Sequence, residues 1–108
     1  MNLFTKIDRY IDYNNHYSIR KGLETMRQEF NKAVKYKNPE YAREVIHTLK
    51  KIYDKLTNSY RQSEDYGEMS FSQRMMSNKM REFIIYLTKR LKKDFGVVES
   101  EVINENPS

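Results

Sequence analysis

The chain has 108 residues, a formal net charge of +5 and no cysteine. Its mean hydropathy of −0.93 leaves no run of roughly 20 apolar residues, which excludes a membrane-spanning helix. Without cysteine the fold has no disulfides and no thiolate metal site, so packing must hold a single domain together. Residues 1–8 lack the basic lead into an apolar run that is typical of a secretion signal, and we expect a cytoplasmic protein.

The first predicted element is a short amphipathic helix. Its apolar positions run from Leu3 through Ile7 to Ile11, which predicts about three turns ending near the polar residues 13–16. A helix of this length is marginal in water by itself. We therefore expect it to dock on the rest of the chain or on a second subunit.

Two longer helices follow. Apolar residues repeat every three or four positions between Ser18, where we expect the second helix to start, and Val34. The third helix has the clearest start, because Asn38 suits the N-cap, Pro39 the first turn and Glu40 the positive end of the helix dipole. Its apolar stripe predicts an end near residue 62, and the tight turn between the two helices makes them antiparallel neighbours.

The polar residues 63–68 predict a loop, the most mobile of the chain. A fourth helix begins after a cap at Ser70 or Ser72, and Gly96 suits a left-handed cap at its end. Beyond it, residues 97–108 contain three Glu and no Lys or Arg, a composition that fits a short strand or a disordered segment.

Together these elements predict an all-α fold, a small bundle of four helices with the first one short and with an acidic C-terminal tail. Residues 1–96 form the helical bundle domain, and residues 97–108 form the extended or disordered tail.

Positive charge concentrates in the fourth helix, since residues 70–96 carry seven basic and two acidic side chains. Such a helix could contact the phosphates of a nucleic acid. The residues that would do so are Arg74, Arg81, Lys89, Arg90, Lys92 and Lys93. We favour the alternative, a solvated helix surface, because no DNA- or RNA-recognition motif accompanies the charge. The acidic tail either masks this helix or acts as a solubilising end, and we favour the second role.

Aromatic residues exceed what a core of this size must hold, with nine Tyr and five Phe. Tyrosine is common at protein interfaces, and Tyr13, Tyr17, Tyr36, Tyr66 and Tyr86 are the ones hardest to place inside. Methionines cluster at the start of the fourth helix, where they could line an adaptable groove or, as we favour, fill the core.

Residues 83–87 are apolar around nearly the whole helix, which indicates either a central helix or burial against a second chain. We therefore expect an oligomer or a protein partner. The candidate protein-interface residues are Met76, Ile85, Tyr86, Tyr66 and Tyr36.

Chemical motifs are scarce. The pair Glu44 and His47 matches the Glu-x-x-His element of di-iron bundles, but those sites need a second copy, which the chain lacks. A zinc site of Asp12, His16, Glu44 and His47 would require the first loop to fold over the third helix, and we favour an exposed His47. We expect no metal, no cofactor, no small-molecule substrate and no catalysis.

The first hypothesis is a small non-enzymatic protein-interaction module, acting as a regulator, inhibitor or assembly subunit. The alternative is a nucleic-acid-binding protein that uses the fourth helix, and a second alternative, by fold analogy alone, is a bacterial immunity or accessory protein. The composition, rich in Lys, Asn and Tyr, suggests an A+T-rich genome such as that of a phage or mobile element.

Overall fold

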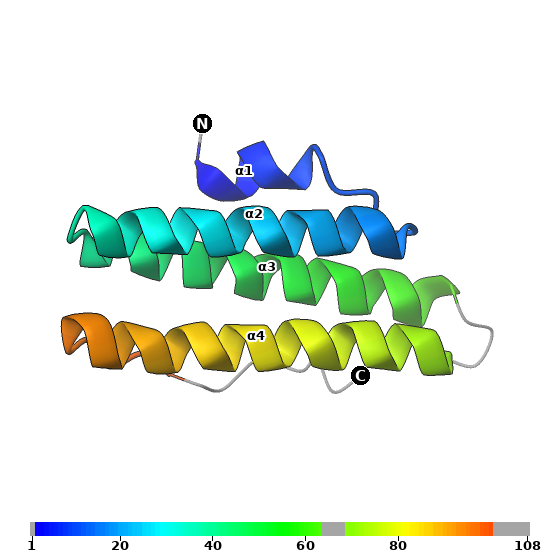
Figure 1. The fold of residues 1–108 in the computed structure, drawn as a ribbon. Coiled ribbons are helices and arrows are strands. Elements are labelled where there is room, and N and C mark those ends of the chain that lie inside the picture. The colour runs from blue at the N-terminus through cyan, green and yellow to red at the C-terminus, as the bar shows by residue number, and fades with distance from the viewer. Residues whose placement is uncertain (1, 64–68, 101–108) are drawn as a thin grey trace.

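The computed structural model describes residues 2–63 and 69–100. Within these ranges the protein is all-α with four helices, the first one short, which confirms the predicted fold class. The helices are α1 (Leu3–Asp8), α2 (His16–Lys35), α3 (Pro39–Ser63) and α4 (Phe71–Phe95). The long helices α2 and α4 run in the same direction, and α3 runs in the opposite direction (Figure 1). Tyr66 and the residues beyond Ser100 lie outside the described ranges, as does most of the predicted loop.

The core lies between the three long helices, and α3 contacts each of the other helices. Every long helix contributes fully buried side chains, among them Phe30, Leu49 and Ile84. The buried hydroxyl of Thr88 donates to the carbonyl of Ile84 in its own helix at 2.8 Å. No helix in the described part of the chain carries a stretch long and apolar enough to cross a membrane.

Helix α1 is shorter than its apolar pattern predicts, and it ends at Asp8 instead of near residues 13–16. The chain leaves the helix there so that Ile11 can pack on α2. A Cβ atom at Gly22 would lie only 2.9 Å from the Ile11 side chain, so glycine at this position permits the contact. The hydroxyl of Tyr13 then donates to the carboxylate of Asp8 at 2.7 Å and closes the turn.

Helix α2 begins two residues before the predicted start at Ser18. The side chain of Asn15 accepts hydrogen bonds from the backbone N–H groups of Tyr17 at 2.9 Å and Ser18 at 3.2 Å. Asn15 is therefore the N-cap, whereas the sequence pattern places it in the loop before the helix.

The turn between α2 and α3 depends on two residues. Lys37 adopts a left-handed conformation with φ of 55°, and the N–H of Asn38 donates back to the carbonyl of Ala33 at 2.8 Å. The side chain of Asn38 then accepts from the N–H of Tyr41 at 3.1 Å, as predicted for the cap of α3. This short connection makes α2 and α3 antiparallel.

Both predicted ends of α4 are confirmed. Ser70, not Ser72, is the N-cap, and with Gln73 it forms a reciprocal capping box. Gly96 has φ of 68° and closes the helix with a hydrogen bond to the carbonyl of Lys92.

Candidate functional site

The most exposed apolar side chains of α4 share one side of the helix. Because 3.6 residues make one turn, positions 71, 75 and 86 fall within an arc of about 60°. Phe71 is 79% exposed, Met75 58% and Tyr86 48%. We call this side the outer face of α4, and it comprises the exposed residues Phe71, Met75, Asn78, Glu82, Tyr86, Lys89 and Lys93.

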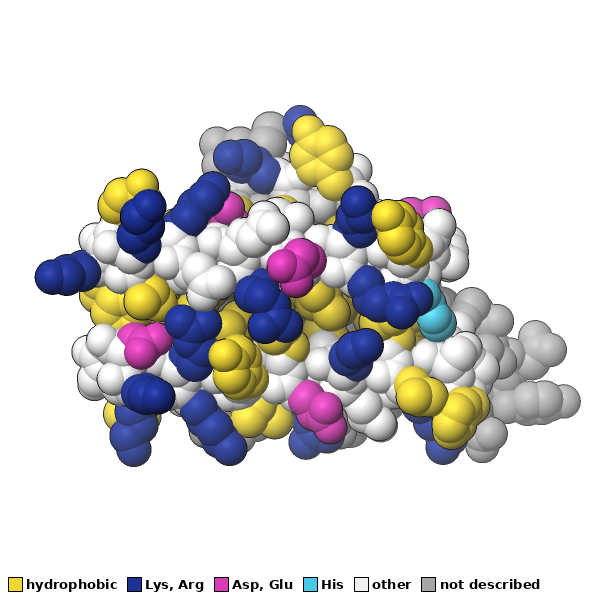
Figure 2. Space-filling model, in the orientation of Figure 1, with side chains coloured by type: hydrophobic (Ala, Val, Ile, Leu, Met, Phe, Trp, Pro, Cys, Tyr) yellow, Lys and Arg dark blue, Asp and Glu magenta, His cyan; other side chains and the backbone are white. Residues whose placement is uncertain are grey.

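Lysine and arginine side chains gather on the side of the molecule formed by α2 and α4, where they outnumber the carboxylates (Figure 2). Helix α2 carries five basic and two acidic side chains, and α4 carries seven and two. The two helices therefore have a combined net charge of +8, and since the whole chain has +5, all other residues sum to −3. The described residues outside these two helices sum to +2, so α2 and α4 are the most basic part of the described structure.

Arginines cover the aromatic core where α2 and α4 meet. The guanidinium of Arg27 lies 5.0 Å from the ring centre of Phe83, and that of Arg90 lies 5.0 Å from Phe30 and 5.9 Å from Tyr86. Cation–π contacts of this kind hold the side chains against the rings. The aromatic ring of Tyr86 is thereby tied to the bundle on one side and open to solvent on the other.

A groove of about 520 Å³ opens beside the start of the outer face. Met75 and Met76 of α4 line it together with His16 and Arg20 of α2, and Lys79 and Glu82 complete its rim. The flexible thioether side chains can adapt to an inserted apolar group. The groove thus extends the apolar part of the outer face towards α2.

The candidate interface residues have different surroundings. Met76 is only 6% exposed and fills the core, so it offers little surface of its own. Ile85 is partly buried and packs against the core. Tyr36 is 71% exposed at the end of α2, under the ammonium group of Lys35. Tyr86 alone among these residues lies on the outer face of α4, while Tyr66 is outside the described ranges.

The apolar run at residues 83–87 has a simpler explanation than burial on all sides. Phe83, Ile84 and Leu87 face the core, Ile85 packs partly against it, and Tyr86 remains exposed. The pattern therefore leaves one aromatic side chain, that of Tyr86, exposed on the surface. Sequence reasoning missed Phe71, although its spacing from Tyr86 places both on the same side of α4.

The six candidate nucleic-acid contacts spread over about half the circumference of α4. Arg90 donates to Asn31 at 2.9 Å and contacts Asp94 at 3.4 Å. Arg74 lines a pocket shared with α3. The other candidates are Arg81, Lys89, Lys92 and Lys93, of which only Lys89 and Lys93 lie on the outer face. The basic residues thus do not form a single row.

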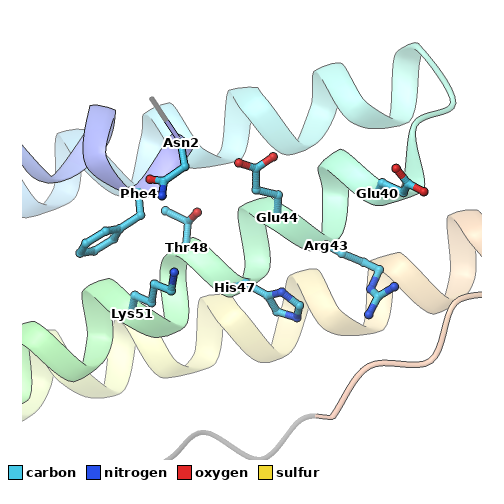
Figure 3. A pocket seen from close by; sticks show the side chains of 8 residues that line it. All are labelled: Asn2, Phe4, Glu40, Arg43, Glu44, His47, Thr48 and Lys51. Carbon is cyan, nitrogen blue, oxygen red and sulfur yellow. The ribbon is translucent and has the colours of Figure 1, made fainter.

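A second concavity, of about 370 Å³, lies on the opposite side of the molecule along α3 (Figure 3). In it Glu44 points towards α1, where its carboxylate accepts from the N–H of Leu3 at 3.4 Å, while His47 points away towards Glu99. The two side chains of the Glu-x-x-His element therefore diverge. Among the described residues no group of three His, Asp or Glu side chains is placed to hold a metal ion.

The first residues of the acidic tail fold back onto the bundle. The carboxylate of Glu99 lies 3.0 Å from both Nε of Arg43 and Nε2 of His47, and the ammonium of Lys50 donates to the carbonyl of Ser100 at 2.9 Å. The hydrogen bond from His47 lowers the pKa of Glu99, burial opposes this, and Arg43 lowers the pKa further. Residues 97–100 have no regular secondary structure. Val98 and Glu99 also share a concavity with Lys89 and Lys92 of α4, so the segment lies beside both α3 and α4.

No family model, no curated protein and no solved structure matches this chain.

Proposed function

We propose that this protein is a small non-enzymatic interaction module that binds another protein through the outer face of α4. The observation that carries the proposal is the alignment of Phe71, Met75 and Tyr86, three exposed apolar side chains on one side of a helix that is capped at both ends. Aromatic and methionine side chains are the ones most enriched in the centres of protein interfaces. The groove beside Met75 adds a place where a partner's apolar side chain can insert.

The test is a triple substitution of Phe71→Glu, Met75→Glu and Tyr86→Glu. Ile85 is left unchanged because its packing against the core would confuse loss of binding with loss of folding. The matched control is Tyr10→Glu with Tyr17→Glu, since these two tyrosines are as exposed but lie beside α1 and the start of α2.

Each tagged variant is recovered from the cells in which the protein is normally made, and the co-purified proteins are compared by mass spectrometry. The unchanged protein and the control should retain the same partner, and the triple variant should lose it while its helical circular dichroism stays the same. Retention of the partner by the triple variant, or recovery of the protein without any partner, would contradict the proposal.

Nucleic-acid binding is the second candidate, and the net charge of +8 on α2 and α4 favours it. The position of Glu82 in the middle of the outer face and the apolar start of that face weigh against it, because a phosphate backbone repels carboxylates. Replacing Lys89, Lys92 and Lys93 by Gln should reduce the salt dependence of any binding to RNA or DNA. Arg90 is excluded from this variant because it bonds Asn31.

A further inference from the structure

The outer face of α4 differs between its two ends. Its first turns present Phe71 and Met75 beside the groove, and its last turns present Lys89 and Lys93. The 25 residues of α4 span about 37 Å, which is long enough to seat a partner helix of several turns. Arg20, Lys79 and Glu82 around the groove sum to +1, whereas Lys89 and Lys93 contribute +2. A partner that matches this face is therefore apolar near the start of α4 and most acidic near its end.

The charge distribution disfavours a second copy of this chain as the occupant. Two copies that met through α2 and α4 would bring basic side chains of these helices, which sum to +8 in each copy, within the screening length of about 8 Å at physiological salt, where like charges repel. Charge complementarity instead favours an acidic surface. The apolar side chains at the start of α4 then require that this acidic surface also carry exposed apolar residues.

We propose that the outer face of α4 binds an acidic amphipathic helix of a partner protein, which runs antiparallel to α4. This inference rests on the proposed function. Acidic residues are stabilising in the first turn of a helix, where the dipole is positive. A partner helix whose acidic first turns meet Lys89 and Lys93 has its later turns beside Phe71 and Met75. Its apolar side chains insert into the groove lined by Met75 and Met76.

The experiment selects binders from a displayed library of 25-residue helical peptides. The apolar positions of one side are fixed, and the flanking positions vary among Glu, Lys, Gln and Ala along the whole peptide. Selection uses the full chain, and sequencing measures the residue preference at each position. We expect Glu to be more strongly enriched in the first half of the bound peptides, which meets Lys89 and Lys93, than in the second half, which meets the groove.

A charge reversal then locates the contact. Lys89→Glu with Lys93→Glu should weaken binding of the selected peptides about tenfold. The matched control, Lys6→Glu with Lys21→Glu, makes the same change in net charge on α1 and on the side of α2 that faces α1, and should leave the affinity unchanged.

Each other outcome overturns the proposal in a distinguishable way. Peptides that bind without preference for Glu, yet are lost with the Phe71, Met75 and Tyr86 triple variant, overturn the acidic helix and leave the proposed function standing. Peptides indifferent to the triple variant, or none at all, overturn both. A dimer in light scattering that the triple variant abolishes identifies a second copy, and salt-sensitive binding of single-stranded RNA that requires Lys89 and Lys93 identifies a nucleic acid.

Discussion

Two regions of the molecule, the contact between α1 and α3 and the outer face of α4, carry similar side chains. In the first these side chains bind one another, and in the second they are exposed to solvent. Around α1 the aromatic and charged groups satisfy one another, as where Asp8 accepts from both Lys55 and Tyr13. On α4 the aromatic ring of Phe71 and the thioether of Met75 are directed to solvent. An excess of tyrosine and methionine thus does not by itself indicate an interface. The structure is needed to tell which of these residues stabilise the fold and which are exposed.

The largest predicted effect compares two apolar side chains, one from each region. Ile7→Ala should lower the free energy of unfolding by about 2–3 kcal/mol, because Ile7 is buried where α1 meets the core. Met75→Ala on α4 should change it by no more than about 0.5 kcal/mol. Urea unfolding of the two variants checks the comparison, and a large loss of stability for Met75→Ala would show that the outer face of α4 supports the fold.

A smaller effect is expected at Asp8, the anchor of α1. Asp8→Asn should cost about 1 kcal/mol, since it removes the ion pair with Lys55 at 2.9 Å and weakens the hydrogen bond from Tyr13. The control is Glu82→Gln, which replaces a carboxylate on the outer face of α4. Thermal unfolding of the two variants compares their losses of stability. Equal melting temperatures would contradict the assigned role of Asp8.

The same carboxylate predicts a pH dependence. Burial raises the pKa of Asp8, but the hydrogen bonds from Lys55 and Tyr13 outweigh it, so the pKa lies below its ordinary value of 3.8. A carboxylate with a lowered pKa stabilises the fold above its ordinary pKa, and this stability is lost as the pH falls through the folded-state value. The stability difference between the unchanged protein and Asp8→Asn should therefore be constant near neutral pH and shrink below about pH 4.

The smallest effect concerns the start of the tail. Glu99→Gln removes the charge that pairs with Arg43 and His47, and it should change global stability by about 0.5 kcal/mol or less. Amide hydrogen exchange at residues 97–100 should nevertheless accelerate, because these residues depend on few contacts. Unchanged exchange would show that the ion pairs do not hold this segment.

The helices could be predicted from the sequence because their signals are local. The stripe of α3, the Asn38 cap and the Gly96 cap each lie within a few residues of the boundary that they set. The early end of α1 could not be predicted, because it depends on the contact of Ile11 with Gly22 on another helix.

The candidate site could be predicted only in part, for the same reason. Tyr86 lies within the apolar run at residues 83–87 and is exposed, whereas Met76 fills the core. The exposure of Phe71 and the partners of Tyr13 depend on which side of each helix faces its neighbours. That information comes from the packing of the three long helices and not from the spacing along one of them.

The most direct test of the account is site-specific photocrosslinking in the protein's own cells. A benzophenone amino acid is placed at position 71 or 86 on the outer face of α4, and at position 10 as an equally accessible control. We predict one protein crosslinked at positions 71 and 86 and absent at position 10. A crosslink to the same partner at position 10 alone, or no crosslinked protein at positions 71 and 86, would contradict the claim that this face is the interface.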